Sequence, residues 1–238
     1  MSVPGSIVIA AGGEFRLVDL TSILNDHTPC YPTDPPFQKS WHEWFGESKF
    51  CVSKLEMGAH SGTHVDAPLH FLGAEFPDVT QVPLRQFIGE ATALDVPKLP
   101  GENLLVSDLE GAVILSGDIV LFRTGWDRRA GSAAFFQDEW PGIDPTLLEE
   151  LIRRGVKAVG GDFPSVDSPA ALAAGAPAHV LAARAGMPVF EGLANLHEAT
   201  GGRFFFMGLP LRIEGGEASP IRAVALLPAS PLADTSRR

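Results

Sequence analysis

Residues 60–70 form the part of this sequence that is richest in side chains able to do chemistry. Three of the seven histidines of the chain, His60, His64 and His70, lie within these eleven residues, together with Asp66. Imidazole and carboxylate groups are the side chains that best bind zinc, manganese or iron in proteins. We therefore interpret this segment as a metal-binding loop with His60, His64 and Asp66 as ligands. Three ligands leave coordination positions open, as catalytic metal sites do.

The local sequence favours a rigid loop over a helix. Gly62 gives the backbone freedom to turn both preceding and following histidines toward one point, and Pro68 prevents a continuous helix. The helical His-Glu-x-x-His motif of metalloproteases is excluded because Ser61 follows the first histidine. The alternative is a histidine-rich surface loop. It is disfavoured because the neighbouring residues are apolar, namely Val65, Ala67, Leu69 and Phe71.

Two residues far along the chain are candidates for additional ligands. His179 stands in an otherwise apolar helical segment, and Glu191 ends the apolar run 187–190. A buried carboxylate without a partner is costly. Taken alone, each residue is more often a hydrogen-bonded structural group than a ligand. Because the three candidate ligands at residues 60–70 leave coordination positions open, metal ligation is the better interpretation for both His179 and Glu191.

The composition limits the possible partners and surroundings of the chain. It has 238 residues, is 45% hydrophobic and 20% charged, and carries a formal net charge of −11. We expect one domain over residues 1–238, and the acidic balance argues against a nucleic-acid partner. The two cysteines indicate a reducing compartment with free thiols. Because the apolar run at residues 7–11 is too short for a signal peptide or a membrane span, we expect a cytoplasmic protein without a membrane partner.

Alternating helical and strand patterns predict an α/β protein. The most distinct helix spans Asp144 to Arg154, with Asp144 as N-cap and a proline at the first helical position. A second helical segment, 170–185, is broken near Pro177, which places His179 in a first turn. A further short helix is expected after an N-cap at Ser107. Strands are expected at 15–20, 51–57 (half-buried), 91–96, 118–124 (buried on both faces), 156–159, 188–191, 203–208 and 221–227.

Three aromatic residues are candidates for the wall of a substrate pocket. Tyr31 lies in a segment stiffened by prolines, 25–36, and Trp41 and Trp44 follow in a stretch expected to be rich in loops. Aromatic rings just before a metal loop could contact an aromatic substrate. The alternative for the tryptophans is core packing, which we favour for at least one of them, and for Tyr31 it is packing of its loop against the body.

The segment His-Ser-Gly-Thr-His-Val-Asp-Ala-Pro-Leu-His-Phe at residues 60–71 resembles the signature of the metal-dependent cyclase or kynurenine formamidase family, which also includes isatin hydrolases. The segments 162–167 and 218–224 are also similar to that family. The resemblance extends from about Val18 to Leu227. It implies a swivelling β/β/α-like fold, with a mixed central sheet flanked by helices.

The resemblance also implies roles for individual residues. His60 and His64 would hold one metal ion, Asp66 and Glu191 would bridge, and His179 would hold a second ion. The cofactor would be zinc, with one or two ions per chain, or manganese. His70 would transfer protons, deprotonating water and then protonating the leaving nitrogen.

The activity implied by the resemblance is metal-assisted hydrolysis of an amide C–N bond other than a peptide bond. An arylformamide such as N-formylkynurenine is the first candidate substrate, because isatin hydrolases are thought to carry a glutamine in the place of Glu191. A cyclic amide or imide such as isatin is the alternative. The resemblance also implies a homodimer or homotetramer in which the neighbouring subunit contributes residues to the pocket. The turn at residues 31–34, Tyr-Pro-Thr-Asp, differs from the family's Trp-Pro-Gly-Asp. The resemblance therefore does not identify the substrate.

Two other classes of function are weighed against an enzyme. One is a protein that binds a ligand through its metal without turnover, for which loss of His70 would have been the sequence signature. The other is a closed structural metal site with four ligands, often cysteines. Neither cysteine, Cys30 or Cys51, belongs to a pair with ligand spacing. An enzyme is therefore the expectation.

Overall fold

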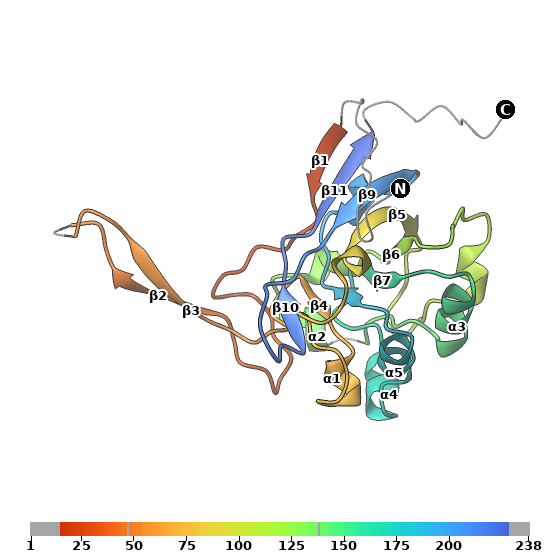
Figure 1. The fold of residues 1–238 in the computed structure, drawn as a ribbon, viewed down its shortest axis with the longest axis horizontal. Coiled ribbons are helices and arrows are strands. Elements are labelled where there is room, and N and C mark those ends of the chain that lie inside the picture. The colour runs from red at the N-terminus through yellow and green to blue at the C-terminus, as the bar shows by residue number, and fades with distance from the viewer. Residues whose placement is uncertain (1–14, 47, 138, 229–238) are drawn as a thin grey trace.

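A large mixed sheet organises the computed structural model, which describes residues 15–46, 48–137 and 139–228 (Figure 1). Its strands are β1 (Phe15–Asp19), β4 (His64–Asp66), β5 (Ile88–Asp95), β6 (Ile119–Arg123), β7 (Ala158–Gly161), β8 (Val189–Glu191), β9 (Arg203–Met207), β10 (Ala218–Pro220) and β11 (Val224–Pro228). They pair in the order β1-β11-β9-β5-β6-β7-β8-β4-β10. Strands β5 to β8 are parallel, and the other pairs are antiparallel. The predicted α/β class with a mixed sheet is confirmed.

The helices of the described residues are short. They are α1 (Leu69–Leu72), α2 (Ala134–Gln137), α3 (Pro145–Arg153), α4 (Pro169–Ala173) and α5 (Pro177–Arg184), with 3₁₀ helices at Leu84–Gln86, Val106–Leu109, Trp126–Arg129 and Leu196–Glu198. Among the residues described, no helix is long and apolar enough to cross a membrane.

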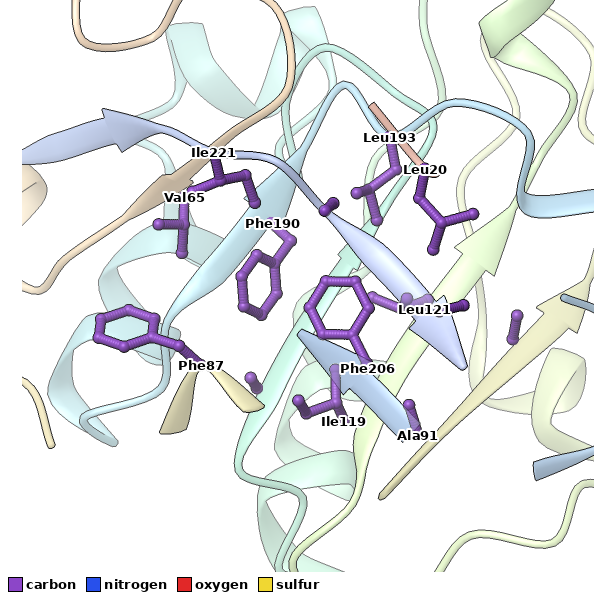
Figure 2. Close-up of a cluster of buried hydrophobic side chains, with 14 of the residues drawn as sticks. Leu20, Val65, Phe87, Ala91, Ile119, Leu121, Phe190, Leu193, Phe206 and Ile221 are labelled. Atoms are coloured by element: carbon purple, nitrogen blue, oxygen red, sulfur yellow. The ribbon is translucent and has the colours of Figure 1, made fainter. Parts of the chain in front are cut away.

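Strand β6 lies in the middle of the sheet and is buried on both faces, as predicted from its unbroken apolar run. Because side chains alternate along a strand, Ile119 and Leu121 contribute to one hydrophobic cluster, and Val120 and Phe122 contribute to the other. In the first cluster the rings of Phe190 and Phe206 meet edge to face, with centroids 4.8 Å apart. Figure 2 shows these rings with Val65 and Ile221 around them.

The second cluster is covered by α3 and α5. The predicted start of α3 is confirmed: the Asp144 side chain accepts a hydrogen bond from the Thr146 backbone N–H at 2.9 Å, and Pro145 occupies the first turn. The side chains Leu147, Leu148 and Leu151 are buried in the cluster. The predicted break near Pro177 separates α4 from α5, with Ala176 in the left-handed region at φ 54°. His179 therefore lies in the first turn of α5, as expected.

A hairpin of β2 (Gln38–Glu43) and β3 (Val52–Glu56) extends away from the body (Figure 1). The expectation of a half-buried strand at 51–57 is wrong in its burial, because every residue of β3 is exposed and the strand pairs only with β2. Trp41 lies in β2 instead of in a loop. Both cysteines are free, in agreement with the sequence.

Three further expectations need correction. The segment 60–70 was expected to be a loop, but its middle forms β4, whose backbone is paired by β8 and β10 on either side. Ser107 is not an N-cap, because it lies inside the 3₁₀ helix Val106–Leu109. The last strand begins at Val224 instead of at 221, and β10 was not predicted. The apolar run at residues 7–11 lies outside the described residues.

Candidate metal centre

Strand β4 delivers two of the predicted ligands to one face of the sheet. Because side chains alternate along a strand, His64 and Asp66 point to one side and Val65 points into the first hydrophobic cluster. The neighbouring strand β8 pairs with β4 so that Glu191 lies directly opposite His64. Residues opposite each other on adjacent strands bring their side chains into contact. His64 and Asp66 of β4 thus meet the carboxylate of Glu191 in β8, although Glu191 lies 125 residues after Asp66 in the sequence.

Each of the two buried carboxylates turns one oxygen toward the pair His60 and His64 and the other oxygen toward His179. Asp66 Oδ1 lies 3.0 Å from His60 Nδ1 and 3.5 Å from His64 Nε2, and Glu191 Oε2 lies 3.4 Å from the same His64 nitrogen. On the other side, His179 Nε2 lies 3.5 Å from Asp66 Oδ2 and 3.2 Å from Glu191 Oε1. The result is two adjacent donor groups that share their carboxylates.

The donors in these groups fit a divalent cation. His60, His64 and Asp66 form one set, and Asp66, His179 and Glu191 form the other, and in each set the donor atoms lie within 4.8 Å of one another. His64 Nε2 and both carboxylate oxygens of Asp66 are buried without a hydrogen-bond partner among the described residues. Unpaired buried polar atoms are costly. Nitrogen and carboxylate oxygen are ligands that suit zinc and manganese. The fit is therefore good, although ligation by these five residues stays a prediction.

The charges of the centre also call for a cation. Burial raises the pKa of Asp66, but His60 and His179 outweigh burial and hold it well below its usual range. Burial and Asp66 raise the pKa of Glu191, whereas His179 and His64 lower it, with a net decrease. Burial lowers the pKa of His60, but Asp66 raises it to about 9. Two ionised carboxylates are thus buried together, and such charges need protons or a metal to balance them.

His70 lies beside the centre without belonging to either donor set. It is carried by α1, and the centroid of its ring is 4.2 Å from that of His60 and 6.0 Å from that of His179. Burial lowers the pKa of His70; Asp66 acts in the opposite direction, but the charges of His60 and His179 add to the decrease. A neutral imidazole next to a metal centre can accept a proton, which agrees with the predicted role without testing it.

A cavity of about 450 Å³ opens over the centre. Its floor contains His60, His64, His70, His179 and Glu191, and its walls are largely aromatic or apolar, with Tyr31, Phe71, Phe136, Trp140 and Leu172. The ring of Tyr31 meets Phe136 edge to face, with centroids 6.0 Å apart. A cavity of this size and lining suits a small aromatic ligand.

The structure brings together most of the residues singled out in the sequence. Tyr31, His70 and four of the five candidate ligands line the cavity, and the fifth ligand, Asp66, lies behind them. Trp41 and Trp44 lie on the exposed hairpin and are not among the lining residues. Sequence reasoning did not find Phe136 and Trp140, which carried no distinguishing spacing. It also did not single out Phe71, although this residue belongs to the quoted motif.

The sequence is similar to those of known proteins. A family model described as "Putative cyclase" matches residues 18–168. A kynurenine formamidase from Salinibacter ruber is 34% identical over 218 residues, covering 87% of this chain and 96% of that protein. An isatin hydrolase from Roseibium aggregatum is 32% identical, covering 91% of this chain and 93% of that protein.

Solved structures show the same likeness in three dimensions. The structure of an isatin hydrolase bound to the product analogue thioisatinate superposes with a TM-score of 0.83 at 28% identity, covering 90% of this chain and 93% of that chain. Isatin hydrolase A from Ralstonia solanacearum gives a TM-score of 0.82 at 30% identity, with 90% and 92% covered.

Proposed function

The chain belongs to the putative cyclase family, and from this premise we propose that it is a metal-dependent hydrolase acting on the amide C–N bond of a small aromatic substrate. The observation that supports this proposal most strongly is the pair of buried carboxylates, Asp66 and Glu191, each of which lies between His64 and His179 beside an aromatic-walled cavity. We propose a single domain over residues 1–238, which the continuous nine-stranded sheet supports. A cytoplasmic location is part of the same proposal.

The metal would be zinc, as one or two ions, or manganese. His60 and His64 would hold one ion, His179 would hold a second, and Asp66 and Glu191 would bridge the two. When bound, a divalent ion lowers the pKa of water toward neutrality and polarises a carbonyl oxygen.

The remaining steps depend on side chains of this protein. His70 would take the proton of the attacking water and return it to the leaving nitrogen. Its position beside His60 and His179, on the lining of the cavity, supports this role. Tyr31, Phe136 and Trp140 would hold the aromatic part of the substrate and exclude bulk water from the centre.

We propose an arylformamide such as N-formylkynurenine as the substrate, supported by the formamidase relatives and by the carboxylate at Glu191. A cyclic amide such as isatin is the second candidate, favoured by the superposition on isatin hydrolases. The test is a panel of formamides, lactams and imides, offered to purified protein whose metal content is known from elemental analysis. The preferred substrate should have a kcat/KM at least about tenfold higher than those of the other amides in the panel, which is the discrimination that an ordinary binding pocket provides. Absence of hydrolysis of every amide by the metal-loaded protein would contradict an enzymatic role.

Replacing Tyr31 by alanine should raise KM for the true substrate by roughly tenfold, with less effect on kcat. The reason is that Tyr31 contacts Phe136 at the cavity wall and would contribute equally to binding in the ground state and in the transition state. Phe15→Ala is a matched control, since Phe15 has nearly the same exposed fraction, 38% against 39%, and does not line the cavity. If Tyr31→Ala changes only the melting temperature, Tyr31 packs its loop and is not part of the site.

We also propose that the protein is a homodimer or homotetramer in which the hairpin β2–β3 packs on a second copy. The hairpin exposes Trp41, Trp44, Phe45, Phe50 and Leu55. Isolated two-stranded hairpins are only marginally stable, and exposed apolar patches mark interaction sites. The register puts Trp41 and Leu55 on the same face, and Trp44 packs on Trp41 with centroids 4.5 Å apart. Trp41 and Trp44 would contact substrate only through such an assembly.

The double change Trp41→Ser with Leu55→Ser should shift the assembly to monomers, because it removes the apolar face of the hairpin. Light scattering after size-exclusion chromatography measures this directly. Lys54→Ser is the control, since Lys54 is exposed, pairs with Ser40 in the register and lies on the opposite face. An unchanged mass in the double variant, or a monomeric wild type at micromolar concentration, would contradict this interface.

A further inference from the structure

The segment 162–168, which follows β7, contacts two residues of the candidate metal centre, Glu191 and His179. At its start, the carboxylate of Asp162 accepts hydrogen bonds from the backbone N–H and hydroxyl of Thr124, at 2.8 and 2.6 Å, and from the Gly125 N–H at 2.7 Å. These bonds tie the segment to the end of β6. Further along, the Val166 N–H donates to Glu191 Oε1 at 2.7 Å. The segment is thus anchored to the sheet at one end and contacts a candidate ligand at the other.

Asp167 makes the most specific contact of this segment. Its carboxylate is fully buried, and Oδ2 accepts hydrogen bonds from His179 Nδ1 at 2.7 Å and from the His179 backbone N–H at 3.0 Å. The other oxygen accepts from the Ala178 N–H at 3.0 Å. Asp167 belongs to neither donor set and does not line the cavity. The proposed hydrolysis therefore gives it no direct part.

We propose that Asp167 is a positioning residue, which fixes the tautomer and the orientation of His179 and thereby sets the affinity of the His179 half of the centre for a divalent ion. A carboxylate only accepts hydrogen bonds, so the Nδ1 of His179 carries the proton and its Nε2 is left free to bind a metal. That Nε2 is the atom that faces Asp66 and Glu191. Phe71 holds the ring from one face, stacked with centroids 4.2 Å apart.

The two halves of the centre differ in what orients their imidazoles. His64 Nδ1 lies 2.9 Å from the backbone carbonyl of Gly62, which is a neutral acceptor, and His60 adds a second imidazole to that half. The other half has one imidazole, His179, and a charged acceptor behind it. A charged acceptor increases the basicity of the ligand nitrogen. The contribution of Asp167 is therefore specific to the half with the single histidine.

This inference rests on the metal centre of the proposed function, and zinc itself is the probe. Asp167→Asn keeps the shape but removes the charge. If the NH₂ of the new amide faces His179, it donates to Nδ1 and moves the histidine proton to Nε2. If the NH₂ faces Ala178 instead, two donors, the NH₂ and the Ala178 backbone N–H, face each other. Chelator competition should show a zinc affinity lowered about 10–100-fold at the class of site that His179→Ala also weakens.

Two controls separate positioning from general damage. Asp162→Asn changes an equally buried carboxylate of the same segment that contacts neither donor set, so it should lower the melting temperature and leave the zinc affinity of the folded protein unchanged. The second control repeats Asp167→Asn in a His179→Ala background. There it should cost no further zinc affinity, because its effect passes through His179.

The outcomes are separable. Wild-type affinity in Asp167→Asn, or an equal loss in the His179→Ala background, would overturn the inference and leave the proposed function intact. A wild-type protein that binds no divalent ion would overturn both. If Asp167→Asn does not fold, imidazole nitrogen NMR of the zinc-loaded wild type decides: a proton on Nδ1 of His179 is the expected result, and zinc on that nitrogen contradicts it.

Discussion

Removal of divalent ions should abolish amide hydrolysis by this protein, and adding back zinc or manganese should restore it. The carboxylates of Asp66 and Glu191 are ionised and buried, and the unpaired His64 Nε2 faces them. Without a divalent ion, the pKa of water stays far above that of an imidazole, so the water of this site would be a poor nucleophile. The measurement is hydrolysis before dialysis against a chelator, after it, and after readdition of each metal, with metal content determined in parallel.

A substitution at the centre should reproduce the effect of the chelator. His64→Ala removes a donor atom that both carboxylates approach within 3.5 Å. Its loss of metal should exceed the roughly 10–100-fold contributed by residues that only support ligands. His27→Ala is the matched control, because His27 is exposed and belongs to neither donor set. Full activity in protein shown to be free of metal would contradict the whole assignment.

The gathering of these side chains could be anticipated because their residue types conflict with their surroundings. His179 in an apolar helix and Glu191 at the end of an apolar strand each needed a polar partner, and the motif at residues 60–70 was the obvious place to find one. The pairing of His64 with Glu191 across β4 and β8 was not predictable. Strand β4 is three residues long, and two of its residues are candidate ligands, so no apolar alternation marks it.

The hairpin illustrates a different limit. Alternation in residues 51–57 correctly predicted a strand, which is β3. The register of the hairpin puts Leu55 on the same face as Trp41. Alternation indicates that one face is apolar, but it does not tell whether the surface that covers it belongs to the same chain. The cavity walls were also out of reach, because aromatic residues such as Phe136 and Trp140 are spaced as they would be in an ordinary core. Contacts of high sequence separation decide their positions.

Asp167 lies in the segment 162–167 that resembles the family, yet its role follows only from the structure. An aspartate near a proline-rich turn is usually a helix cap, and Asp167 does accept hydrogen bonds from the first N–H groups of α5. Only the distance to His179 Nδ1 separates capping from positioning. The sequence spacing of twelve residues between the two is compatible with either role.

Replacing His70 by asparagine should lower kcat by roughly 10²–10⁴-fold while leaving the metal bound. Asparagine has a similar size and can hydrogen-bond, but it does not exchange protons near neutral pH. His70 belongs to neither donor set, so no coordinating atom is removed. Its ring centroid lies 4.2 Å from that of His60 and 6.0 Å from that of His179, and His70 lines the cavity in which the substrate would bind.

The control and the contrary outcome concern metal content as much as rate. His197→Asn makes the same chemical change at an exposed histidine remote from the cavity, and it should leave both kcat and metal content unchanged. If His70→Asn stays folded but loses its metal, His70 is a ligand and the proton must be moved by another group. If it keeps both metal and kcat, no proton passes through His70. A loss of kcat at unchanged metal content and nearly unchanged KM is the pattern expected when an interaction made only in the transition state disappears, and this pattern would assign acid–base transfer to the imidazole of His70.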